Sequence, residues 1–328
     1  SVCIDLKSDA GLALFYDLVK ESDVVISNFG AGVPEKLSID FDSLAKVNPK
    51  IITCTVNGFG SDGPAFKRPA FDQVAQAMGG GMSITGIDSD NPTRAGIPIG
   101  DLGGGMFGVM GILAALFERE RSGMGQHVDI SMLDCQISML NYMATMFFLS
   151  GDNPHPIGNS HFVHVPYNTF TCSDGFIVIA VITDNFWQNL KTLVNCPDFD
   201  DSKYDGQPGR WEDRDMINAR LNDILSKNTC AFWLEQLERE RIPCAPVNNF
   251  SQALSDEQVL HRNMVIDLKH PSGASTKGPG NPIKLSRSGS EEFSAAPLLG
   301  EHTSEVLTQL LGMPEDAIES LKQSGVIA

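Results

Sequence analysis

The chain has 328 residues, 42% of them hydrophobic and 20% charged, which is enough for two domains or one large one. A net charge of −17 disfavours nucleic acid as a partner, because such a surface repels phosphate backbones. The seven cysteines are odd in number and form no Cys-x-x-Cys pair, so neither disulfides nor a zinc site is predicted. Reduced thiols indicate the cytoplasm, or the mitochondrial matrix in a eukaryote. No run approaches 18 apolar residues, so no membrane-spanning helix is predicted.

Helix and strand patterns alternate at the start of the chain, which predicts βαβ units and a parallel sheet. The ends of such strands face the ligand crevice. A chain that begins directly with a strand indicates further sequence upstream of Ser1. The predicted elements are a strand over Ser1–Leu6, a helix over Asp9–Glu21 capped by Ser8, a strand over Asp23–Ser27, a helix over Phe41–Val47 and a strand over Lys50–Val56.

The middle of the first domain is rich in loops and glycine. A short helix is predicted over Phe71–Met78, and a long helix over Gly105–Arg121 ends at a glycine. The centre of that helix, Val109–Phe117, is apolar nearly all round, so it is predicted to be buried. A strand over Gln126–Met132 and a helix over Asp134–Leu149 follow.

Proline and glycine mark two linkers, residues 151–166 and 271–284, on either side of a predicted small α+β domain at 167–270. Residues 1–150 and about 285–328 are predicted to form one large Rossmann-like domain, to which the terminal helices return. The remaining predicted elements are a strand over Phe176–Ala180 and helices over Asp184–Val194, Met216–Leu225, Cys230–Glu240, Ser304–Leu311 and Pro314–Ser324.

The most informative segment for chemistry is Gly96–Met106, where a single carboxylate, Asp101, stands among glycines before the long helix. Glycines let a large ligand approach the main chain. Backbone N–H groups at a helix start can stabilise an oxyanion, and a carboxylate there can act as a nucleophile. The alternative that Asp101 is only a turn or N-cap residue stays open at this point.

Other motifs carry less information. Gly103, Gly105 and Gly108 match the dinucleotide pattern G-x-G-x-x-G, with Asp129 about 20 residues on, but Pro98 makes the preceding segment a poor strand. His155, His161 and His164 lie in a proline-flanked segment without a further ligand, so they are interpreted as a polar linker, and no metal is predicted.

An ordered set of motifs resembles the family III CoA transferases, which include formyl-CoA and carnitine CoA transferases and α-methylacyl-CoA racemases. The resemblance covers essentially the whole chain. The motifs are Asn28-Phe29, Gly58-Phe59-Gly60-Ser61-Asp62-Gly63-Pro64, Phe71-Asp72 with Gln76-Ala77, Gly100-Asp101, Leu116-Phe117-Glu118-Arg119, Gly123-Met124-Gly125-Gln126, Ser131-Met132-Leu133-Asp134, Ile242–Val247 and Pro297–Thr303.

The resemblance implies an α/β fold with a large Rossmann-like domain, a small domain and two subunits interlocked as a homodimer. It implies acyl-CoA and carboxylate substrates and no cofactor other than CoA as substrate. The net charge and the lack of a long apolar run predict no nucleic-acid and no membrane partner. Asp101 falls on the nucleophilic aspartate of the family. The CoA- and substrate-binding positions that it implies are Lys36 and Leu37 at the adenine, Arg68, Phe71, Asp72, Gly103 and Gly104.

The chain departs from the family pattern at two places. Gly30 replaces an arginine that many members carry, and the segment His161–Tyr167 lacks the glycine-rich loop of formyl-CoA transferases. In the racemases a histidine stands where this chain has Phe71, and phenylalanine has no titratable proton. The sequence therefore predicts a CoA transferase, with a CoA-ester racemase or a non-catalytic acyl-CoA-binding relative as the alternatives.

Overall fold

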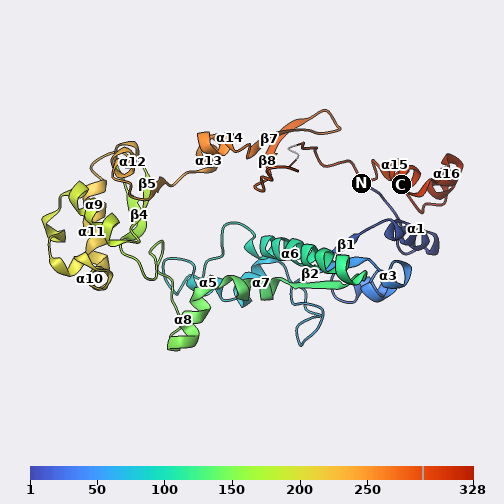
Figure 1. The fold of residues 1–328 in the computed structure, drawn as a ribbon, viewed down its shortest axis with the longest axis horizontal. Helices are drawn as coiled ribbons and strands as arrows, with labels where there is room; N and C mark the ends of the chain where they lie inside the picture. Colours follow the sequence, from blue (N-terminus) through green and yellow to red (C-terminus); the bar gives the residue numbers. More distant parts are fainter. Residues whose placement is uncertain (290–291) are drawn as a thin grey trace.

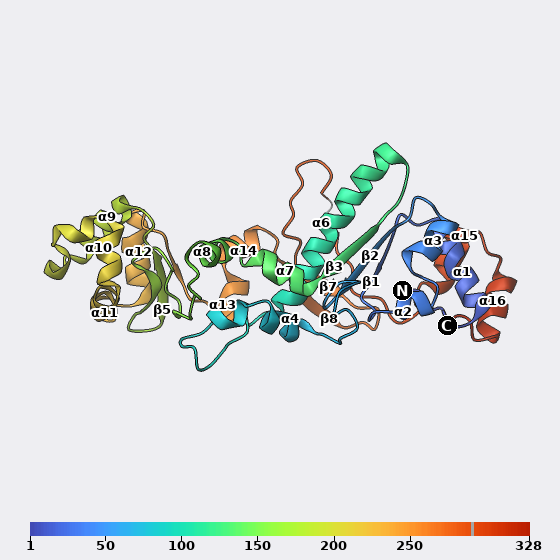
Figure 2. The ribbon, with the colours of Figure 1, turned by 90° about the horizontal axis from the view of Figure 1, so that it is seen from below.

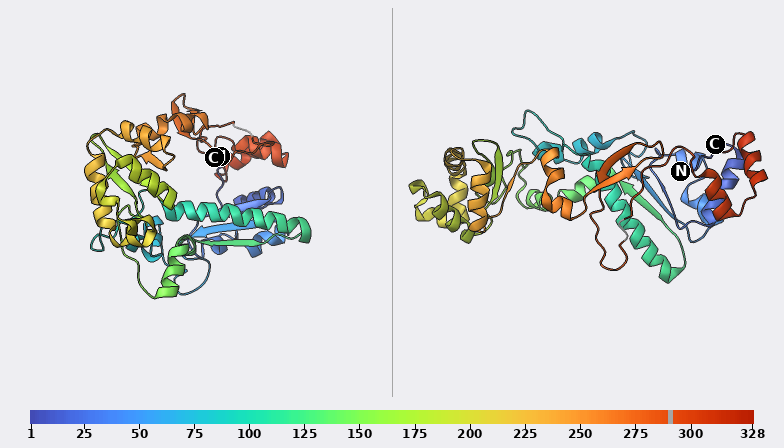
Figure 3. Two further views of the ribbon diagram at one scale, coloured as in Figure 1. Left: turned by 60° about the vertical axis from the view of Figure 1, so that its left-hand side comes forward. Right: turned by 90° about the horizontal axis from the view of Figure 1, so that it is seen from above.

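The computed structural model describes residues 1–289 and 292–328. The described chain follows a ring-like path (Figures 1 and 3). A parallel α/β layer forms one side of the ring, a separate helical and sheet region lies at one end, and residues 247–289 and 292–302 return along the opposite side. The two termini meet, since the N–H of Asp5 donates to the carbonyl of Val326 at 2.9 Å and Ile4 forms a β-bridge with Ile327.

The sheet at the centre of the first region is parallel, as predicted, with strands in the order β1-β2-β3. The strands are β1 (Val24–Ser27), β2 (Ile52–Asn57) and β3 (His127–Ser131). The helices α1 (Asp9–Lys20) and α3 (Phe41–Val47) begin at N-caps whose side chains, Ser8 and Asp40, accept backbone N–H groups. Both helices contribute to a small core around Val19, Leu44 and Ile51. The predicted strand at Ser1–Leu6 is wrong, because only the single bridge at Ile4 forms there.

The long helix α6 (Ile99–Ser122) lies across this sheet (Figure 2). Its packing face is made of small residues, since a Cβ at Gly104 would lie 2.8 Å from Val56 Cγ1 and one at Gly111 would lie 2.6 Å from Val128 Cγ1. The glycines therefore let the helix approach the strands closely. The prediction of burial all round is wrong. The side chains on the face turned away from the sheet are about half exposed, namely Leu102, Met106, Val109, Met110, Leu113 and Phe117.

By length and composition alone, α6 is apolar enough to cross a membrane, with 33% of its most apolar window buried. The prediction that the chain has no membrane-spanning helix stays a prediction. The feature is weak evidence of membrane insertion, because a core helix of an α/β layer passes the same test and α6 packs on β2 and β3.

Shorter helices complete this region, and α4 (Asp72–Met78) and α7 (Met132–Met139) pack against α6. The others are α2 (Val33–Lys36), which follows β1, α5 (Gly81–Ile84) and α8 (Tyr142–Ser150). The single helix predicted over Asp134–Leu149 is in fact two helices, because Asn141 has a φ of 51° and interrupts the helical backbone.

The region at the end of the ring has its own antiparallel sheet, β4 (Tyr167–Thr171), β5 (Phe176–Ala180) and β6 (Cys244–Pro246). The helices α9 (Asp184–Val194), α10 (Gln207–Glu212), α11 (Arg214–Leu225) and α12 (Cys230–Arg239) cover it. A core that contains Phe170, Trp187 and Leu221 joins these elements. Two short 3₁₀ helices, Pro197–Phe199 and Ser202–Asp205, complete it.

The returning segment carries α13 (Phe250–Ser255), α14 (Glu257–His261) and the hairpin β7 (Val265–Lys269) to β8 (Ser275–Pro279). The helices α15 (Thr303–Leu311) and α16 (Glu315–Gln323) then pack with α1 in a core that joins Leu14 to Leu307 and Ile318. This packing supports a large domain built from both ends of the chain. The domain boundaries given above stay a prediction.

Candidate active site

The candidate nucleophile, Asp101, lies in the first turn of α6. The sequence placed it in a loop before a helix that begins at Gly105, and this is wrong, because α6 begins six residues earlier, at Ile99. The Asp101 side chain is exposed, whereas Gly100 and Gly103 beside it are buried. A carboxylate in a first turn is favoured by the partial positive charge of the helix start. The fold therefore presents this carboxylate to solvent at a fixed point.

Asp72 begins α4 and reaches the start of α6. The N–H of Gly100 donates to Asp72 Oδ1 at 2.7 Å. A Cβ at Gly100 would lie 2.9 Å from the same oxygen, so only glycine fits without a shift. The structure thus brings together two of the predicted site residues, Asp72 and Asp101, through the motif glycine Gly100. Phe71, the N-cap residue of α4, is 82% exposed.

The backbone N–H groups at the start of α6 are largely used by the protein itself. The N–H of Ile99 donates to the carbonyl of Ile97 at 2.8 Å, and that of Leu102 donates to the carbonyl of Pro98 at 3.0 Å. The N–H of Gly100 donates to the Asp72 carboxylate. These three groups therefore do not supply the oxyanion site that the sequence suggested, because their hydrogens already have acceptors.

Gly103 and Gly104 lie inside α6 and face protein. A Cβ at Gly103 would lie 2.8 Å from Met139 Cε, and Gly104 faces Val56. The dinucleotide reading of this segment is wrong, because its glycines form a helix rather than a phosphate-binding turn, and Asp129 accepts the hydroxyl of Ser61 at 2.6 Å. A contact of CoA with the backbone of Gly103 or Gly104 stays a prediction.

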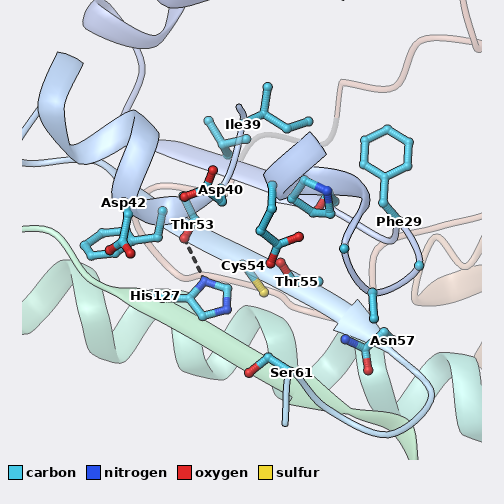
Figure 4. A pocket seen from close by; sticks show the side chains of 18 of the residues that line it. Phe29, Ile39, Asp40, Asp42, Thr53, Cys54, Thr55, Asn57, Ser61 and His127 are labelled. Carbon is cyan, nitrogen blue, oxygen red and sulfur yellow. Dashed lines mark hydrogen bonds between the residues drawn. The ribbon is translucent and has the colours of Figure 1, made fainter. Parts of the chain in front are cut away.

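A cavity of about 330 Å³ lies over β1 and β2 and their following turns (Figure 4). Phe29, Gly30 and Asn57 line it, as does His127, whose Nδ1 lies 2.7 Å from Thr53 Oγ1. The lining contains the carboxylates of Glu35, Asp40 and Asp42 and, among the described residues, no lysine or arginine. By charge this cavity suits an uncharged group better than a phosphate.

The predicted CoA contacts on this side lie outside that lining. Lys36 and Leu37 follow Glu35 at the end of α2, where Lys36 is exposed and Leu37 is half-buried. The Arg68 guanidinium lies 5.3 Å from the ring centre of Phe59. The roles of Lys36, Leu37 and Arg68 toward CoA stay predictions. Sequence reasoning missed His127 and Thr53, since each is an ordinary strand residue.

A second cavity, also of about 330 Å³, lies between the first linker and α11. His161, His164 and Arg214 contribute to its lining, and His161 stacks on Tyr167 with ring centres 5.0 Å apart. Burial, together with the nearby His164, lowers the pKa of His161. Among residues 1–289 and 292–328 no three His, Cys, Asp or Glu side chains are placed to hold a metal ion.

Comparisons with known proteins agree on one family. A model of CoA-transferase family III matches residues 1–303. Succinyl-CoA:glutarate CoA-transferase of Mus musculus is 31% identical over 328 residues, which are 100% of this chain and 75% of that relative. Acetyl-CoA:oxalate CoA-transferase of Acetobacter aceti is 34% identical over 288 residues, which are 87% of this chain and 73% of that relative.

A solved structure gives the same result. The crystal structure of a CAIB/BAIF family protein from Brucella suis has a TM-score of 0.81 and 32% identity to this chain, covering 94% of this chain and 80% of that one. These matches define an enzyme that transfers CoA in acyl-CoA metabolism. The chain belongs to CoA-transferase family III, the CaiB/BaiF family.

Proposed function

We propose that this chain moves CoA from an acyl-CoA donor to a free carboxylic acid through a covalent aspartyl thioester on Asp101. The observation that carries the proposal is the position of Asp101. Its exposed carboxylate stands in the first turn of α6, and the preceding residue, Gly100, is tied to Asp72. Such a carboxylate is free to react while its backbone is held.

The reaction begins when the Asp101 carboxylate attacks the thioester carbonyl of the donor. The carbon–sulfur bond breaks, a mixed anhydride forms and the CoA thiolate leaves. The thiolate then attacks the aspartyl carbonyl, which releases the donor acid and leaves an aspartyl–CoA thioester. The acceptor carboxylate repeats both steps in reverse and restores Asp101. Covalent catalysis divides one difficult transfer into easier steps.

The acceptor that we propose is a dicarboxylic acid. Relatives are named for glutarate, oxalate and mesaconate, each of which has two carboxylates. The segment His161–Tyr167 lacks a glycine-rich loop, which argues for an acceptor longer than oxalate. A screen that pairs succinyl-CoA and acetyl-CoA with free dicarboxylates and monocarboxylates, followed by chromatography of the CoA esters, identifies the pair.

Replacement of Asp101 tests the mechanism. Asp101→Asn keeps the size of the side chain but removes the nucleophile, so the transfer rate should fall by about 10³-fold or more. The wild-type protein, incubated with acyl-CoA and then with hydroxylamine or borohydride, should carry the modification on the peptide with Asp101. Near-normal transfer by Asp101→Ala, or a label on Asp72, contradicts the assignment. If Asp101→Ala still binds CoA but does not turn over, Asp101 has a chemical role rather than a binding role. Turnover by the wild type argues against a non-catalytic acyl-CoA-binding protein.

The racemase alternative requires different side chains in the same region. Proton exchange at the α-carbon needs an acid/base pair, and Phe71 offers no titratable proton at the position where racemases carry histidine. With a 2-methylacyl-CoA in deuterated water, the wild-type protein should therefore incorporate little deuterium. Rapid exchange with loss of configuration supports the racemase instead.

The assembly that we propose is an interlocked homodimer in the cytoplasm or the mitochondrial matrix. Two observations support the dimer. The chain follows a ring-like path (Figure 1), and the apolar face of α6 turned away from the sheet is about half exposed. Seven free cysteines support a reducing compartment.

A further inference from the structure

Gln76 is an amide side chain in the interior of the candidate active-site region. It lies on α4 and is 3% exposed. Its Nε2 donates to Asp72 Oδ2 at 2.8 Å, and its Oε1 accepts the N–H of Ala95 at 2.9 Å. Both ends of the amide are therefore bonded, which is the arrangement that a buried polar group requires.

The two bonds of Gln76 hold both ends of the segment that leads into α6. One end is Ala95, bonded directly. The other end is Gly100, which is linked to Gln76 through Asp72. The N–H of Gly100 donates to Asp72 Oδ1 at 2.7 Å, while Gln76 donates to Oδ2 of the same carboxylate. The N-cap residue Pro98 supplies no side-chain hydrogen bond to the helix, so Asp72 takes the place of a cap from outside the helix.

The segment between these two bonds has little other support from burial. Gly96, Ile97 and Pro98 are exposed. Arg94 Nη1 donates to the carbonyls of Ala95 and Gly96, which adds a bond on the solvent side. The direction in which Asp72 presents its carboxylate to Gly100 is set by the Gln76 amide on its other oxygen.

We propose that Gln76 is a positioning residue for the reaction: through Asp72 and Ala95 it fixes the start of α6 and so the place of Asp101. This inference rests on the proposed function of Asp101. Gln76 does not touch the reacting atoms. Its effect is on the geometry of attack, where a displacement of about 1 Å costs about 10²-fold in rate.

The main test is Gln76→Met, which keeps the length of the side chain and removes both hydrogen bonds. We expect kcat for CoA transfer to fall by about 10²-fold, while KM for acyl-CoA changes by less than about 3-fold, because binding elsewhere is untouched. The matched control is Gln136→Met. Gln136 on α7 is 6% exposed, and its Nε2 has no hydrogen-bond partner in the described part of the chain. A loss of kcat no larger than that of Gln136→Met overturns the proposal.

A second variant gives a pH readout that a merely structural role would not produce. Gln76→Glu keeps an acceptor for Ala95 but places a carboxyl group against that of Asp72. At pH 8 the two charges repel each other, and at pH 5.5 one shared proton restores the bond. The other charged groups around this point are Arg94 before α6 and Asp101 in its first turn. The kcat of the variant relative to wild type should rise by about 10-fold between pH 8 and pH 5.5, and a constant ratio overturns the proposal.

Hydrogen exchange separates a failure of this inference from a failure of the proposed function. The Gly100 N–H should exchange about 10-fold faster or more in Gln76→Met than in wild type and in Gln136→Met, whether or not the protein transfers CoA. Unchanged protection of Gly100 overturns the positioning role. If the wild type transfers no CoA but Gly100 loses protection in Gln76→Met, then the proposed function fails. The positioning role of Gln76 at the start of α6 is still supported in that case.

Discussion

Arg210 lies in the interior of the region formed by β4 to β6 and α9 to α12, where its side chain is 0% exposed. Its guanidinium donates to the carbonyls of Val165 and Tyr204 at 2.9 and 2.7 Å and to Asp184 at 2.8 Å. In the sequence, Arg210 is one of 24 lysine and arginine residues, and no local motif sets it apart. Its role comes from the tertiary structure, because the groups that it satisfies belong to separate segments of the chain.

At the residue scale we predict that Arg210→Ala lowers the free energy of unfolding by about 3 kcal/mol, because two buried carbonyls lose their donors and a cavity forms. Asp184 is 64% exposed and adds little, since water solvates its charge. Urea denaturation measures the change. The control is Arg214→Ala, whose side chain is 41% exposed and for which we expect a change within about 0.5 kcal/mol. Equal effects of the two substitutions contradict this account.

At the element scale, the packing of α6 depends on which glycines face the sheet. The helix pattern in the sequence predicted its existence and its C-terminal end near Arg121, but it placed the start at Gly105. Glycines lower helix propensity, so a local reading counts them as loop. Close contact with Val56 and Val128 compensates for that cost here, and this contact is a property of the packed layer.

The prediction at this scale compares two neighbouring positions of α6. Gly104→Ala should destabilise the protein by about 1–2 kcal/mol, because its Cβ would lie 2.8 Å from Val56 Cγ1 and the overpacking exceeds the gain in helix propensity. Gly105→Ala should stabilise it by about 0.5–1 kcal/mol, because no atom lies within 4 Å of its Cβ. The midpoints of urea denaturation report both signs. Loss of stability in both variants would rule out the packing explanation.

At the scale of the whole molecule, the ring-like path and the exposed apolar face of α6 lead to the proposed homodimer (Figure 1). Light scattering at micromolar concentration should give about twice the chain mass of 35.5 kDa. If the subunits interlock, tagged and untagged dimers should not exchange chains without unfolding. A monomeric mass contradicts the dimer, and rapid exchange contradicts the interlocking.

A pair of variants tests whether α6 lies in that interface. Leu113 on α6 is 59% exposed, and Leu310 on α15 is 57% exposed. Leu113→Glu should lower the dimer fraction, because it places a charge in a buried apolar contact. Leu310→Glu is the control and should leave the mass unchanged. The opposite result would move the interface away from α6.

Local patterns in the sequence predicted the parallel α/β layer, the family and, to within two residues, most of the helices that were expected. These features depend on local patterns: capping residues such as Ser8, apolar periodicity, and motifs in a fixed order. The helices α2, α5, α10, α13 and α14 were not predicted. Sequence patterns did not predict the short strands β4 and β6 to β8 or the helix break at Asn141. Short elements gain their stability from neighbours that are distant in sequence.

How the candidate site is held follows from the tertiary structure. It placed Asp101 inside the first turn of α6, gave Gly100 an acceptor in Asp72, and joined Gln76 to Ala95. It also showed that one face of α6 is covered by the sheet and the other is not. The physical reason is the same in each case. Hydrogen-bond partners and burial depend on which segments contact each other in space. A single sequence specifies the residues of each segment but not the contacts between segments.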